Sequence, residues 1–133
     1  MVQKKDLLES LKDILDSYLD KVEGSEVIFI STLDGHVILK SSSEDHEIDM
    51  ITPVSGSILG LADSIAMSFR RQKLHENISI MDNYVLGLFK MYDKENTLFL
   101  GVVCNRVLSL GKMLNFAKST IKELNQELER LEA

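Results

Sequence analysis

Residues 51–73 read ITPVSGSILGLADSIAMSFRRQK, and this central stretch organises the rest of the chain. Apolar side chains recur along it at steps of three and four, which aligns them on one side of a helix. They are Ile51, Val54, Ile58, Leu61, Ile65 and Phe69. Leu59 and Ala66 widen this stripe sideways, whereas Gly56, Gly60 and Met67 fall on the far side of an ideal helix. We therefore predict a helix that packs on more than one side, with the stripe on its own sheet.

The segments on either side of this helix predict two further helices and five strands. Residues 4–22 carry a broad apolar face, and residues 109–131 carry apolar residues, mostly leucines, at alternating steps of four and three. The β-rich runs 27–32 and 36–40 are joined by an Asp-Gly turn, which indicates a hairpin. Three more β-rich runs follow the central helix, at 77–81, 84–92 and 97–104. Their connections are too short for parallel crossovers, so they form an antiparallel meander.

The resulting order is α-β-β-α-β-β-β-α, which predicts an α/β (α+β) fold with a five-stranded, mostly antiparallel sheet. Several strands are apolar on both faces, so helices must cover the sheet on both sides in a three-layer α-β-α arrangement. The two terminal helices can share one face, which leaves the central helix alone on the other. One helix covers five strands poorly, and a second copy of it from a partner subunit would complete the layer.

Composition limits the class of protein. A chain of 133 residues suits one domain, here residues 1–133, and the 44% hydrophobic content is ordinary for a globular protein. The net charge of −6 argues against a nucleic-acid partner, because phosphate binding needs a basic surface. The single cysteine, Cys104, favours a reducing compartment, and we expect a cytoplasmic protein without membrane insertion.

No catalytic or cofactor-binding constellation emerges from the sequence, so we expect no enzyme, no cofactor and no metal site. Gly111-Lys112 is followed by Met113 and lacks the earlier glycine of a P-loop. The three histidines, His36, His46 and His75, lack the spacing of metal ligands.

Two features of the central helix can be explained either by the structure of the chain itself or by contact with a partner. Arg70 and Arg71 lie in a basic patch, which either stabilises the helix C-terminus through the macrodipole or contacts an acidic partner. Gly56 and Gly60 each cost roughly 1 kcal/mol within a helix relative to alanine. These glycines, with Met67 nearby, either open an apolar patch to a partner or only avoid a clash within the chain.

The hairpin IFISTLDGHVI (residues 28–38), the long helix after a polar loop and the closing strand FLGVV (residues 99–103) resemble the roadblock family of dynein light-chain type. The resemblance covers residues 7–123, and residues 124–133 extend the last helix beyond it. It implies a profilin-like sheet and a homodimer in which the central helices pair and the strand after them joins its counterpart. At the matching positions, the implied dimer interface includes Leu59, Ala66, Ile78 and Ile80.

Members of this family act as motor-complex adaptors, as scaffolds or as regulators of small Ras-like GTPases. The resemblance therefore implies a non-catalytic homodimer that binds and regulates such a GTPase, and in some members activates GTP hydrolysis. The surface offered to the GTPase would include Gly56, Gly60, Met67, Arg70 and Arg71. Two alternatives remain open: a passive scaffold or adaptor in a motor or signalling complex, and a small-ligand sensor.

Overall fold

The computed structural model describes residues 4–42, 48–106 and 110–132. Eight elements follow one another in the predicted order. They are α1 (Lys4–Lys21), β1 (Ser25–Thr32), β2 (Val37–Ser42), α2 (Ile48–Ser68), β3 (Glu76–Ile80), β4 (Tyr84–Lys90), β5 (Leu98–Asn105) and α3 (Leu110–Glu132). The predicted helix at 51–73 is displaced: α2 begins earlier and ends at Ser68, after which Arg70 and Arg71 adopt left-handed φ angles of 57° and 53°.

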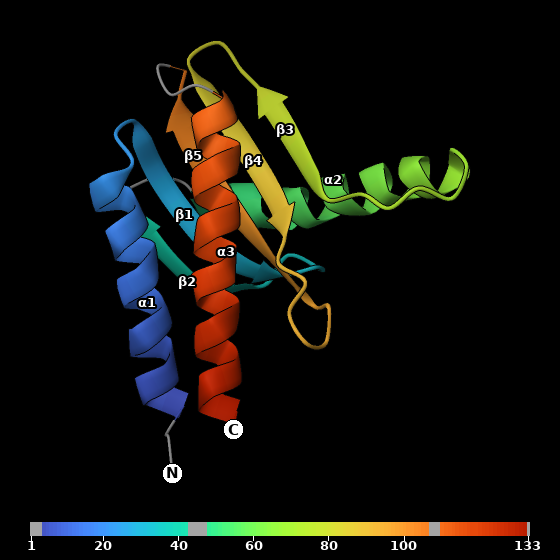
Figure 1. Ribbon diagram of the computed structural model, residues 1–133. Coiled ribbons are helices and arrows are strands. Elements are labelled where there is room, and N and C mark those ends of the chain that lie inside the picture. Colours follow the sequence, from blue (N-terminus) through green and yellow to red (C-terminus); the bar gives the residue numbers. More distant parts are fainter. Residues whose placement is uncertain (1–3, 43–47, 107–109, 133) are drawn as a thin grey trace.

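The five strands form one antiparallel sheet with the order β2-β1-β5-β4-β3 (Figure 1). The hairpin β1–β2 and the meander β3–β4–β5 are local, as their short turns predict. The pairing of β1 with β5 joins the two halves of the chain, with Phe29 opposite Gly101. This order leaves β2 and β3 at the two edges of the sheet.

Helices α1 and α3 lie side by side on one face of the sheet, and α2 crosses the other face (Figure 1). A large apolar cluster joins α1 and α3 to the sheet and includes Leu15, Ile28, Phe89 and Leu124. The C-terminal part of α3 runs beside α1, where the Ser10 hydroxyl donates a hydrogen bond of 2.6 Å to Glu127. The three-layer prediction is therefore confirmed.

A smaller apolar cluster joins α2 to the opposite face of the sheet. The rings of Phe29 and Phe99 meet edge to face at 6.1 Å, and Leu59 of α2 packs in the same cluster. Gly101 leaves the space for this arrangement, since a Cβ atom there would lie 2.1 Å from the Phe29 ring.

The tip of the β1–β2 hairpin packs against the first turns of α2 through two glycines. A Cβ atom on Gly35, whose φ is +95°, would lie 2.7 Å from the Cα of Pro53. A Cβ atom on Gly56 would lie 2.7 Å from the carbonyl oxygen of Leu33. Gly56 therefore faces its own chain, which corrects the expectation that it lies outward on a partner surface.

The orientation of α2 about its axis differs from the expected one. Leu59 is 2% exposed and lies on the sheet, whereas Leu61 and Ile65 are 69% and 71% exposed. The expected arrangement placed Leu61 and Ile65 on the sheet and Leu59 against a partner. Small residues explain the difference: Thr52 and Ser55 are buried with Leu59 and allow α2 to approach strands that already carry bulky aromatic side chains.

Candidate protein interaction site

An exposed apolar stripe runs along α2, on the side turned away from the sheet. It consists of Val54, Leu61, Ile65 and Phe69, all large hydrophobic residues that the chain itself leaves uncovered. The C-terminal half of α2 extends past β3, beyond the edge of the sheet (Figure 1). A contiguous exposed apolar surface of this kind is typical of a protein interface.

The apolar composition of α2 favours contact of its exposed surface with another molecule. Within the described ranges, one helical stretch is long and apolar enough to span a membrane by length and composition, namely Asp49–Ser68 of α2. Only 22% of this stretch is buried within the chain. Buried core helices pass the same test. The helix also carries Asp63, which pairs with Lys90 of β4 at 2.7 Å and ties α2 to the sheet. A second protein surface therefore suits this helix better than lipid, because the charged residue Asp63 lies within the apolar segment.

The free edge of β3 lies next to the projecting half of α2. Among the described residues, β3 pairs with β4 on one side, and its other side is open. Ile78 and Ile80 face the layer of α1 and α3, because they lie opposite Gly87 and Val85 and Ile78 packs on the cluster beneath those helices. Ile80 is exposed. An open edge strand is a ready template for pairing with another strand.

A shallow apolar hollow of about 420 Å³ lies between α2 and the end of the sheet near the β3–β4 turn. Its lining is mainly apolar and comes from α2, β1, the β3–β4 turn, β4 and β5: Glu26, Val27, Met50, Ile51, Met81, Tyr84, Leu86 and Val103. Met50, Met81 and Tyr84 are exposed. Stripe and hollow together form a surface that one α2 helix leaves uncovered.

The structure separates the residues predicted for dimer and partner contacts. Leu59 belongs to the core, so it supports an interface only by holding α2 in place. Ala66 is half-buried, and Gly60 faces open space, since a Cβ atom there would meet nothing within 4 Å. Met67 is exposed on the same helix. For these positions a role in binding remains a prediction.

Two exposed arginines, Arg70 and Arg71, follow the projecting end of α2. Arg70 stacks over the Phe69 ring, with its guanidinium carbon 5.4 Å from the ring centroid. Arg71 is exposed beside it. This pair places positive charge directly next to the apolar stripe, which combines an apolar anchor with a charged rim.

Buried titratable groups elsewhere serve packing. Burial raises the pKa of the Cys104 thiol to about 12, so at neutral pH the thiol is protonated and a poor nucleophile. Burial likewise raises the pKa of Tyr18. In the part of the chain that the structure describes, no group of three metal-ligating side chains converges.

The sequence pattern predicted that the stripe packs on the chain's own sheet, and did not indicate that it is exposed. A helical period identifies which side chains align, but the same stripe can face the chain's own sheet or another molecule. One signal was present: Thr52, Ser55 and Gly56 form a small-residue strip near Leu59, which indicates close approach to a second backbone layer.

The sheet order, the two helical layers and the projecting α2 define the fold of a roadblock/LC7 domain, which confirms the expected resemblance at the level of fold. The Roadblock/LC7 domain from Streptomyces avermitilis has a TM-score of 0.79 at 13% identity, covering 89% of this chain and 97% of that chain. A solved MglB, described with a tetrameric arrangement, has a TM-score of 0.83 at 14% identity, covering 98% and 95% of the two chains.

The profilin-like character of the sheet is confirmed as well. Profilin IA of Acanthamoeba castellanii has a TM-score of 0.59 at 17% identity and covers 89% of this chain and 98% of its own. No family model matches the chain, and no curated protein matches it in sequence. At these identities the likenesses establish the fold.

Proposed function

We propose that this chain forms a homodimer through α2 and the edge of β3, and that the dimer binds and regulates a small Ras-like GTPase. The observation that carries the dimer is the exposed stripe of Leu61, Ile65 and Phe69 beside the open edge of β3. Both features lie at one border of the molecule, so a single partner can cover them together.

A two-fold axis near β3 accounts for both features at once. Antiparallel pairing of β3 with its counterpart continues the sheet across the dimer and satisfies the backbone groups at the open edge. The two α2 helices then lie side by side with their stripes in contact. The projecting half of each helix covers the partner's sheet, where the hollow near Met81 and Tyr84 accepts apolar side chains.

The GTPase assignment rests on the roadblock resemblance and on the MglB-like fold. In this proposal the chain supplies a surface and the GTPase supplies its own hydrolytic residues. Gly60, Met67, Arg70 and Arg71 are the contact residues we assign to that surface, at the flank and end of α2. The dimer joins two such surfaces, so one GTPase can contact both helices.

Light scattering tests the dimer. We expect twice the chain mass for the wild type and a monomer for Ile65→Glu, because a carboxylate in the middle of a helix-helix contact is buried without a partner. The control Lys122→Glu changes an exposed residue on α3 and should leave the dimer intact. A wild-type monomer at micromolar concentration would refute this arrangement.

GTP turnover tests the regulatory role. A Ras-like GTPase from the same genome is assayed with and without the dimer, and with the Arg70→Glu/Arg71→Glu variant. We expect a change in turnover with the wild type that the variant loses. Binding with unchanged turnover would instead identify a passive scaffold, and absence of binding would contradict both roles.

A further inference from the structure

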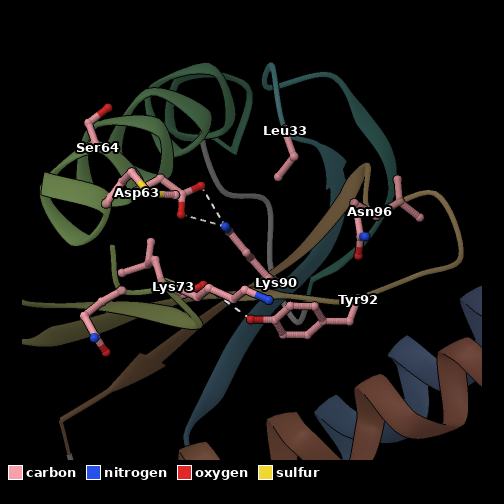
Figure 2. A pocket seen from close by; sticks show the side chains of 11 residues that line it. Leu33, Asp63, Ser64, Lys73, Lys90, Tyr92 and Asn96 are labelled. Atoms are coloured by element: carbon pink, nitrogen blue, oxygen red, sulfur yellow. Dashed lines mark hydrogen bonds and ion pairs between the residues drawn. The ribbon is translucent and has the colours of Figure 1, made fainter. Parts of the chain in front are cut away.

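A second hollow, of about 600 Å³, lies on the flank of α2 opposite the apolar stripe. It is an open hollow bordered by α2, the segment that returns from α2 to β3, the end of β4, the β4–β5 turn, the start of β5 and the tip of the β1–β2 hairpin (Figure 2). We propose that this hollow binds a small organic anion. Lys73 and Lys90 would hold the anionic head group, and Leu33 and Leu98 would contact an apolar body.

The charge of the hollow favours an anion. In a chain with a net charge of −6, its lining carries two lysines and one carboxylate, that of Asp63. Its volume falls in the range of roughly 300–1,000 Å³ that is usual for small-molecule sites. Apolar walls with a few converging polar groups are the common composition of such sites.

Lys90 lies in the hollow, where its ammonium group forms an ion pair with the carboxylate of Asp63. Its Nζ lies 2.7 Å from each carboxylate oxygen of Asp63, and its side chain is 21% exposed (Figure 2). An ammonium group has three donors, so a bound anion can share Lys90 with Asp63. The two anions compete for the same positive charge, and removal of the Asp63 charge should therefore strengthen ligand binding.

The opposite wall of the hollow is held in place before any ligand arrives. Tyr92 and Asn96 have left-handed φ angles of 55° and 54°, a conformation that is costly for tyrosine and well tolerated by asparagine. The Tyr92 hydroxyl donates a hydrogen bond of 3.3 Å to the carbonyl oxygen of Leu74 and also contacts Nδ1 of His75. A preformed wall lowers the entropic cost of binding.

The hollow stays open in the proposed dimer. Each residue turns a helix by about 100°, so Asp63 and Ile65 project from nearly opposite sides of α2. A second copy that covers Ile65 therefore leaves Asp63 and Lys90 accessible. Ligand binding and dimer formation are separate properties, and either can fail without the other.

Isothermal titration calorimetry with simple probes tests the proposal. Phenyl phosphate and phenylacetate carry an anionic head on an aromatic body, benzyl alcohol keeps the body without the charge, and inorganic phosphate keeps the charge without the body. We expect saturable binding of at least one aromatic anion and at least tenfold weaker binding of the other two probes. Equal binding of benzyl alcohol, or no binding of either aromatic anion, would overturn the assignment.

Three variants locate the site. Lys73→Met should weaken the aromatic anion at least tenfold, and Asp63→Asn should strengthen it severalfold because Lys90 is released. The control Lys122→Met makes the same charge change as Lys73→Met on an exposed part of α3 and should leave affinity unchanged. Equal losses in both lysine variants, or weaker binding by Asp63→Asn with an unchanged circular dichroism spectrum, would refute the site. Scattering on the same samples reports the dimer independently.

Discussion

Asp63 and Lys90 join the projecting half of α2 to β4 through an ion pair in which Lys90 Nζ lies 2.7 Å from both carboxylate oxygens. The Lys90 side chain is 21% exposed and that of Asp63 is 42% exposed, so solvent screens the pair only in part. The ion pair joins α2 to the sheet near the point where the helix extends past it. It therefore helps to hold α2 in the orientation that leaves the apolar stripe exposed.

The first prediction concerns the strength of this pair. We expect a coupling of about 1 kcal/mol, at the upper end of the values typical of exposed ion pairs, because Lys90 is partly buried. A double-mutant cycle of Asp63→Ala and Lys90→Ala, followed by urea unfolding, measures it. The pair Lys12 and Asp16 on α1, at 2.8 Å and more exposed, is the control and should give a smaller coupling. Equal couplings would show that the tie to β4 has no special role.

The second prediction compares two glycines one turn apart on α2. Gly60→Ala should stabilise the protein by roughly 1 kcal/mol, because alanine is the better helix former and the added Cβ meets nothing within 4 Å. Gly56→Ala should destabilise it, because the same Cβ would lie 2.7 Å from the Leu33 carbonyl oxygen. Urea unfolding of both variants checks this. Similar effects at the two positions would mean that Gly56 does not face the hairpin.

The third prediction tests the orientation of α2. Leu59→Ala should cost about 2–5 kcal/mol, since it opens a cavity between α2 and the sheet. Leu61→Ala should lose stability only through the dimer, so its melting temperature should fall below that of the wild type at high protein concentration and equal it at concentrations where both proteins are monomeric. Thermal melts at several concentrations separate the two effects. A concentration-independent loss of similar size in both variants would place Leu61 in the core and contradict the described packing.

The fourth prediction follows from the buried thiol. Because the pKa of Cys104 is raised from 9.0 to about 12, the unfolded chain releases the thiol proton first as the pH rises. The stabilising contribution is fully present below about pH 9 and is lost between pH 9 and 12. Urea midpoints at pH 7 and pH 10 should therefore differ more for the wild type than for Cys104→Ala. An identical pH dependence would show that the thiol does not contribute.

The sequence by itself determined the elements, their order and their antiparallel connections. Short turns such as those before Tyr84 and Thr97 allow few topologies, and strands that are apolar on both faces require two helical layers. The hairpin of residues 28–38 and the strand of residues 99–103 were sufficient for the roadblock resemblance. These features depend on local chemistry, so they can be read without knowledge of distant contacts.

Only the tertiary structure decided which side of α2 the sheet covers. Leu59 and Leu61 have the same chemistry, and the helical period alone favours the longer stripe that contains Leu61. The outcome depended on distant residues: the Phe29 and Phe99 rings fill the sheet surface, and the hairpin tip needs the space above Gly56. The same long-range assembly brings Lys90 to Asp63 and creates the hollow beside them, which no local sequence pattern encodes.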